Sequence, residues 1–223
     1  MMKVFSYSGK GKRTHNEDSS ACRQLSNGSA LLVVADGMGG YDCGAESAKI
    51  VVEAIAATFE ADCSNDISSA SANANIAVAE FKAQKGIEQT GCTVAGALVS
   101  DSEAKIFWAG DSRVYIVRGG AVVYQTEDHS LVNEMKKVRV LTPKQISKYE
   151  HIVRRAIMGD VADKLEEAIV SLMPGDEILV CSDGLYKGLP VETILMRLRK
   201  GIEQFELDDE KFEDNYSLIY AII

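Results

Sequence analysis

Apolar positions in the first part of the chain change from a continuous run to helical spacing. Residues 30–35 form a short unbroken apolar run, which predicts a buried strand. Residues 45–60 and 67–85 then carry apolar side chains at helical spacing, so each stretch predicts a helix. Residues 1–20 are polar, and no strand or helix is assigned to them. Candidate capping groups precede the second helix, at Ser64, Asn65 and Asp66.

The middle of the chain predicts mainly strands. Four short apolar segments follow one another closely and predict a meander, with Gly119-Gly120 as a two-residue hairpin turn before the last of them. Residues 128–159 predict short helices, and Thr142-Pro143 has the form of a cap followed by proline in the first helical turn. The four strand segments are 93–99, 104–109, 113–118 and 121–125.

The last part of the chain predicts three more strands and one helix. The strands cover 167–172, 177–181 and 216–223, and the helix covers 191–200. Strands and helices are thus grouped in blocks, which favours antiparallel sheets with helices packed outside them, an α+β fold. No repeat, low-complexity tract or linker marks a boundary, so we expect a single domain over residues 1–223.

Composition narrows the range of functions. The chain has 223 residues and a formal net charge of -9, and this acidity argues against nucleic-acid binding and against attraction to an anionic membrane. No stretch approaches the roughly 20 apolar residues of a membrane-spanning helix, and the N-terminus lacks the apolar core of a signal peptide. The five cysteines are scattered without a C-x-x-C pair, which favours reduced thiols and a cytoplasmic protein.

Carboxylates lie at positions where a fold would hold them rigidly. Asp36 and Asp183 each follow an apolar strand and precede a glycine, which lets backbone or ligand approach closely. Any one such aspartate is as well explained as a turn residue or a helix cap. Taken together, with few histidines and no paired cysteines, they favour an all-oxygen site for magnesium or manganese. Further carboxylates lie at a turn or ahead of a strand, namely Glu17, Asp18, Asp111 and Asp214.

A series of short motifs runs through nearly the whole chain. The motifs are R-T-H-N-E-D at 13–18, V-V-A-D-G-M-G-G at 33–40, G-C-T-V-A-G-A-L at 91–98, A-G-D-S-R-V-Y at 109–115, E-D-H-S-L-V at 127–132, R-A-I-M-G-D at 155–160, C-S-D-G-L at 181–185 and D-N-Y-S-L-I at 214–219. In this order they resemble the motifs of the metal-dependent protein phosphatases of type 2C, in particular the compact bacterial members. No single motif is specific, but the ordered series is.

This resemblance implies a fold, a reaction and partners. The fold is a four-layer α-β-β-α sandwich of two antiparallel β-sheets flanked by helices. The reaction is hydrolysis of phosphoserine and phosphothreonine in proteins by a water bridging two Mn²⁺ or Mg²⁺ ions, since such ions activate water and offset charge on the phosphate. The partners implied are phosphorylated proteins and a serine/threonine kinase with its substrates, and the molecule is expected to be a monomer.

The resemblance also implies roles for the residues around the two ions. Asp36 would bridge both ions, and Asp183 and Asp214 would complete the coordination of one of them. The carbonyl oxygen of Gly37 would hold the other ion, on which Glu17 would act through water.

The remaining implied roles concern the substrate and a further ion. Arg13 would grip the substrate phosphate with two parallel hydrogen bonds, and Asp18 would orient a metal-bound water. Asp111 and Asp183 would hold a weaker third metal ion. Lys187 stands where an aspartate is common in the family, so we expect its positive charge to weaken that third site.

Two other departures and two alternatives stay open at this point. Met38 replaces a histidine proposed as general acid in some members, and Cys92 replaces the more usual threonine. One alternative is a catalytically inactive family member that serves as a scaffold. The other is a nucleotide-binding module, because a glycine-rich loop follows the strand at 30–35, although the loop lacks the G-x-G-x-x-G spacing.

Overall fold

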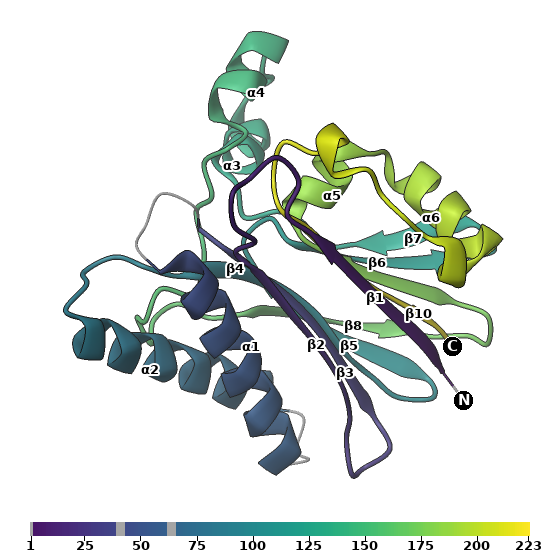
Figure 1. Ribbon diagram of the computed structural model, residues 1–223, viewed down its shortest axis with the longest axis horizontal. Coiled ribbons are helices and arrows are strands. Elements are labelled where there is room, and N and C mark those ends of the chain that lie inside the picture. The colour runs from purple at the N-terminus through teal and green to yellow at the C-terminus, as the bar shows by residue number, and fades with distance from the viewer. Residues whose placement is uncertain (1, 39–42, 62–65) are drawn as a thin grey trace.

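The computed structural model describes residues 2–38, 43–61 and 66–223, which form two five-stranded antiparallel sheets stacked between helices (Figure 1). The predicted four-layer α+β sandwich is therefore confirmed. In chain order the elements are β1 (Lys3–Gly9), β2 (Asp18–Gln24), β3 (Ala30–Gly37), α1 (Gly44–Ala61), α2 (Ile67–Lys85), β4 (Cys92–Val99), β5 (Glu103–Ala109), β6 (Arg113–Arg118), β7 (Ala121–Gln125), α3 (Leu131–Val138), α4 (Pro143–Tyr149), β8 (Glu166–Ser171), β9 (Glu177–Cys181), α5 (Asp183–Gly188), α6 (Val191–Lys200), the 3-10 turns η1 (Ile202–Gln204) and η2 (Asp209–Lys211), and β10 (Tyr216–Ile222).

The four layers follow from the order of the strands. One sheet has the order β1-β10-β9-β6-β7 and the other has the order β2-β3-β4-β5-β8. Helices α1 and α2 cover the outer face of the second sheet, while α5 and α6 cover the outer face of the first (Figure 1). In the described residues, no helix combines the length and the apolar character needed to cross a membrane.

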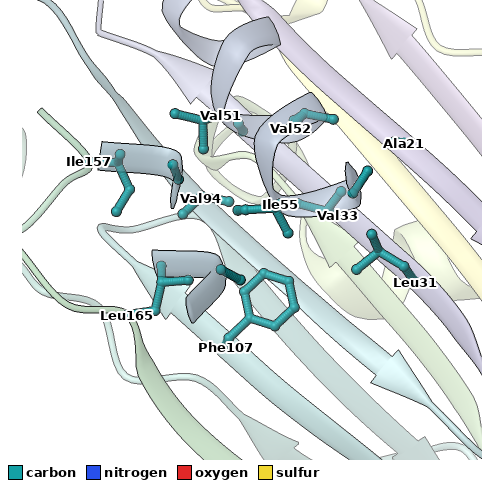
Figure 2. Close-up of a cluster of buried hydrophobic side chains, with 14 of the residues drawn as sticks. Ala21, Leu31, Val33, Val51, Val52, Ile55, Val94, Phe107, Ile157 and Leu165 are labelled. Carbon is teal, nitrogen blue, oxygen red and sulfur yellow. The ribbon is translucent and has the colours of Figure 1, made fainter. Parts of the chain in front are cut away.

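Strand β3 shows why its sequence is apolar without interruption. Successive side chains of a strand point to opposite faces, and both faces of β3 are buried. Leu31 and Val33 pack against α1, as Figure 2 shows, whereas Leu32 and Val34 lie in the core between the two sheets. Because both cores hold this strand, the aspartate at its end is fixed in position.

Helices α5 and α6 are held against the first sheet by a third apolar core. Leu185 of α5 and Ile194 of α6 are fully buried there, together with Leu179 of β9 and Leu218 of β10. Helix α5 was not predicted from the sequence, because it is short and carries glycine in its first turn. Its first residue is Asp183, so the same packing positions that carboxylate.

The predicted meander of four strands is wrong. Strands β4 and β5 belong to one sheet, and β6 and β7 belong to the other, so the chain crosses between the sheets at residues 110–112. Gly110 has φ +114, and a Cβ there would lie 2.4 Å from the Cβ of Thr93, so this crossing requires glycine. The predicted hairpin turn Gly119-Gly120 between β6 and β7 is confirmed, with φ values of 57 and 89.

Two strands, β1 and β2, were not predicted from the sequence. Pairing with a neighbouring strand, and not a local apolar pattern, defines each of them. β1 is largely polar and exposed, and it pairs along its whole length with β10, from Lys3 opposite Ile222 to Gly9 opposite Tyr216. β2 pairs with β3 and begins at Asp18, which lies opposite Asp36. Neither segment shows a local apolar pattern strong enough to predict this pairing.

The second helix is confirmed at its predicted bounds. Asp66 caps α2 by accepting hydrogen bonds from the backbone amides of Ser68, at 3.0 Å, and Ser69, at 3.3 Å. Some of the sequence predictions lie outside the described residues, namely the capping groups Ser64 and Asn65 and residues 39–40 of the glycine-rich motif.

Candidate metal centre

A cleft of about 500 Å³ lies where β3, the crossing between β5 and β6, the start of α5 and the segment before β10 come together. Seven of the eight predicted site residues line it: Arg13, Glu17, Asp36, Gly37, Asp111, Asp183 and Asp214. The eighth, Asp18, lies behind this wall, where its Oδ1 atom is buried. The fold therefore gathers residues that are up to 201 positions apart in sequence into one place. The other lining residues are Met38, Thr93, His151, Ile152, Val153 and Lys187.

Asp36 lines the cleft, and Asp18 lies directly behind it. They lie opposite each other on the adjacent strands β2 and β3. Ser182 donates a hydrogen bond to Oδ2 of Asp18 at 2.7 Å, while Oδ1 of Asp18 is buried without a hydrogen-bond partner in the described residues. Burial, together with the charges of Asp183 and Asp214, raises the pKa of Asp18 to about 7.

Asp36 is the most strongly perturbed carboxyl of the cleft. Burial raises its pKa well above the usual range, and the nearby charges of Asp18, Asp183 and Asp111 raise it further. Like charges held this close cannot all remain ionised unless a cation offsets them. A doubly charged cation is the usual means by which proteins stabilise such a cluster.

Asp111 and Asp183 share one basic side chain. The ammonium group of Lys187 donates to the carboxylate of Asp183 and lies 3.4 Å from Oδ2 of Asp111. Burial and the charge of Asp183 raise the pKa of Asp111 to about 6, although Lys187 works in the opposite direction. The second oxygen of Asp183, Oδ1, is buried and has no hydrogen-bond partner among the described residues.

Arg13 and Asp214 lie at the mouth of the cleft and pair with each other. Nη2 of Arg13 is 2.8 Å from Oδ2 of Asp214, and both side chains are about half exposed. Arg13, which is predicted to bind the substrate phosphate, therefore pairs with Asp214, which is predicted to bind a metal ion. Either role requires this exposed pair to open, which costs little because surface ion pairs contribute about 0–1 kcal/mol.

Asn215 is a site residue that the sequence analysis missed. Its buried amide donates to the carbonyl oxygens of Lys10 and His15, both at 2.8 Å, and its Oδ1 accepts from the amide of Glu17 at 2.9 Å. The carbonyl of Glu17 in turn accepts from the amide of Gly37 at 3.1 Å. Asn215 thus holds the loop of residues 10–17 against the end of β3 that carries Asp36 and Gly37. The only sequence signal was its place in the motif D-N-Y-S-L-I.

The chemistry of the cleft fits hard divalent cations. The two buried oxygens without partners, on Asp18 and Asp183, point to a missing positive charge, and carboxylates predominate among the ionisable side chains that line the cleft. Across residues 2–38, 43–61 and 66–223, no three acidic, histidine or cysteine side chains are already gathered as a metal-ligand set. Arg13 pairs with Asp214, and Lys187 pairs with Asp183. The exposed Arg13–Asp214 pair has to open before Asp214 can contact a metal ion.

Comparison with known proteins identifies the class of protein that shares this arrangement. The α-β-β-α sandwich is shared with solved serine/threonine phosphatases. One is the catalytic domain of PstP in complex with two manganese ions, with a TM-score of 0.81 and 27% identity over 99% of this chain and 97% of that chain. The sequence profile of protein phosphatase 2C matches residues 7–211. The chain therefore belongs to the protein phosphatase 2C family, as its motifs predicted.

Curated relatives agree with this assignment. Serine/threonine protein phosphatase PstP of Mycobacterium tuberculosis is 28% identical over 195 residues, which cover 84% of this chain. The chain spans only 37% of the length of that relative. Serine/threonine phosphatase stp of Listeria monocytogenes is 25% identical over 189 residues, covering 80% of this chain and 75% of the relative.

Proposed function

We propose that this chain is a metal-dependent protein phosphatase that hydrolyses phosphoserine and phosphothreonine with two Mn²⁺ or Mg²⁺ ions. The observation that carries the proposal is the pair of buried, unpartnered oxygens of Asp18 and Asp183 beside Asp36 in an acidic cleft. Two bound cations supply activation of a water molecule and neutralise charge on the phosphoryl group. The reaction needs no covalent phosphoenzyme, and the two cysteines of β4 and β9, Cys92 and Cys181, are fully buried.

The metal ligands proposed are Asp36, Asp183, Asp214, Glu17 and the carbonyl oxygen of Gly37. Asp36 is proposed as the ligand shared by both ions, a role supported by its place at the end of β3 and by the nearby charges of Asp18, Asp183 and Asp111. Asp183 comes from the start of α5 and Asp214 from the segment before β10, whereas Glu17 precedes β2 and Gly37 ends β3.

Asp18 and Arg13 are proposed to act on the water and the substrate. Asp18 is fixed by Ser182, and its free oxygen can accept a hydrogen bond from a water in the cleft. Arg13 is exposed at the mouth and can exchange its ion pair with Asp214 for two hydrogen bonds to a phosphate. Met38 lines the cleft but carries no acidic proton, so protonation of the leaving group falls to a water.

The proposed substrates are phosphorylated proteins. The names of PstP and stp as serine/threonine phosphatases support this substrate class, and a serine/threonine kinase acting on the same proteins would be the functional counterpart. We further propose a cytoplasmic monomer whose residues 1–223 act as one domain, without nucleic-acid or membrane partners. The net charge of -9 supports the last two exclusions, because anionic polymers and surfaces repel it.

The test is Mn²⁺-dependent hydrolysis of p-nitrophenyl phosphate and of a phosphothreonine peptide. Asp36→Asn and Asp183→Asn should each lower kcat/KM by about 100- to 1,000-fold or more, because each removes a negative charge proposed to hold the cations that stabilise the transition state. Asp101→Asn is the matched control, since Asp101 is exposed in the turn between β4 and β5. A folded wild-type protein without activity at any metal concentration would support the scaffold alternative. Nucleotide binding in calorimetry without hydrolysis would support the nucleotide-binding alternative.

A further inference from the structure

Lys187 is the one basic residue of α5, and it reaches two carboxylates of the cleft at once. It follows Asp183 by one helical turn, the spacing and order in which an acidic and a basic side chain pair favourably on a helix. Its ammonium group also lies 3.4 Å from Oδ2 of Asp111, on the crossing between β5 and β6. One positive charge therefore bridges two carboxylates that belong to different elements.

The position of this ammonium is fixed by the residue before it. The hydroxyl of Tyr186 donates to the backbone carbonyl of Asp111 at 2.9 Å, and the guanidinium of Arg113 lies 3.6 Å from the centre of the Tyr186 ring. Arg113 is itself held by two hydrogen bonds to the carboxylate of Asp128. These contacts tie α5 to the crossing, so Lys187 stays beside Asp111 even though its own side chain is 44% exposed.

We infer that Lys187 takes the place of a third divalent cation between Asp111 and Asp183, so that this protein binds two metal ions and supplies the next positive charge itself. The inference rests on the proposed two-metal function. It departs from the expectation that Asp111 and Asp183 hold a weak third ion, because that ion does not fit the residues present.

The reason is competition for the same oxygens. A divalent ion shared by Asp111 and Asp183 needs carboxylate oxygens at about 2.0–2.6 Å, and Lys187 contacts the Oδ2 atom of each. The unpartnered Oδ1 of Asp183 stays available to the two-metal centre. Asp111 lines the cleft with only 6% of its side chain exposed, so little of its carboxylate is open to an ion beside the ammonium group of Lys187. The lysine is tethered to the site, so its effective concentration there exceeds that of a dilute free ion.

The experiment counts Mn²⁺ ions bound per chain, by native mass spectrometry and by equilibrium dialysis. The proteins are the wild type, Lys187→Asp, Lys187→Gln and the control Lys211→Gln. Lys211 also pairs with an aspartate on its own helical turn, but it lies outside the cleft. The wild type and Lys211→Gln should bind the same number of ions at saturation. Lys187→Asp should bind one more, and Lys187→Gln should bind the same additional ion more weakly.

Further variants locate the additional ion and exclude misfolding. Asp111→Asn introduced into Lys187→Asp should abolish the extra binding, and circular dichroism should show unchanged folds because Lys187 is half exposed. Equal metal counts in the wild type and in both Lys187 variants would overturn the inference. A wild-type protein that binds no Mn²⁺ at all would overturn the proposed function and the inference with it, and that result differs from a count of two ions that Lys187 does not influence.

Discussion

Asn215 shows how one buried side chain can organise a site that it does not line. Its amide and carbonyl groups make three hydrogen bonds to the backbone of residues 10, 15 and 17. A buried donor or acceptor left without a partner costs about 1–3 kcal/mol, so the surrounding backbone depends on an amide at this position. The positions of Glu17 and, through its carbonyl, of Gly37 follow from these bonds.

Replacing Asn215 by aspartate keeps its size but removes both donors. We expect Asn215→Asp to weaken Mn²⁺ binding by about 10- to 100-fold, because the loop that carries Glu17 loses its anchor. Isothermal titration calorimetry measures this directly. Asn73→Asp, at an exposed asparagine of α2, should leave the affinity unchanged. Unaltered Mn²⁺ binding by Asn215→Asp would show that the loop is held by other contacts.

A second residue-scale prediction concerns pH and lies far from the cleft. Hydrogen bonds from Arg118, at 2.7 and 2.9 Å, and from the amide of Met173, at 2.8 Å, hold the pKa of Asp176 below its usual range. Since the folded state lowers this pKa, the ionised carboxylate stabilises the fold above about pH 4. That contribution is lost as the pH falls through the lowered value.

Asp176→Asn should therefore lower the free energy of unfolding by about 1–3 kcal/mol at pH 7, as expected for hydrogen bonds to a buried charged group. The difference from the wild type should shrink when urea denaturation is repeated at successively lower pH below 4. A difference that stays constant across this range would mean that the ionised form of Asp176 is not what stabilises the fold.

At the scale of elements, the contact between α5 and the start of β10 controls where Asp183 lies. A Cβ on Gly184 would lie 2.0 Å from the backbone oxygen of Asn215, so the helix packs against this backbone without room for a methyl group. Gly184→Ala should push α5 outward, destabilise the fold by about 1–3 kcal/mol and weaken Mn²⁺ binding. Thermal unfolding and calorimetry check both effects. Gly201→Ala, where nothing lies within 4 Å, is the control and should change neither.

Elements with local signals were predictable, and those that depend on distant partners were not. The cap at Thr142-Pro143 was read correctly, because Thr142 and Gln145 complete a capping box within α4 itself. Strand β1 was missed, because its partner β10 lies at the other end of the sequence. The crossing at residues 110–112 was taken for a turn within one sheet, since the sequence does not state which sheet each strand joins.

The same distinction between local signals and distant partners applies to the residues of the candidate site. The motifs identified seven residues that line the cleft, because the residue types suited to binding metal or phosphate can be recognised within each short motif. The sequence did not supply their partners, such as Arg13 for Asp214 or Ser182 for Asp18. These pairs join segments that only the folded chain brings together. His151 illustrates the limit, since it is exposed and lines the cleft although it belongs to none of the motifs.

At the scale of the whole molecule, the apolar core between the two sheets fixes the position of one sheet against the other, and the cleft takes its residues from segments joined to both. Ile106 of β5 is fully buried in that core, whereas Ile169 on the edge strand β8 is 63% exposed. Ile106→Ala should lower the free energy of unfolding by about 2–5 kcal/mol, because it removes apolar contacts and leaves a cavity. Ile169→Ala makes the same chemical change and should cost less than about 0.5 kcal/mol. Chemical denaturation of both variants tests the comparison, which fails if the two losses are equal.

The pairing of β1 with β10 places a condition on folding during translation. β1 cannot pair until residues 216–222 have been translated, and the two segments then lie side by side (Figure 1). Asp214 and Asn215 immediately precede β10. A nascent chain that ends upstream of residue 214 lacks both residues, so we expect it not to bind metal. We therefore expect metal binding to appear only after β1 and β10 have paired.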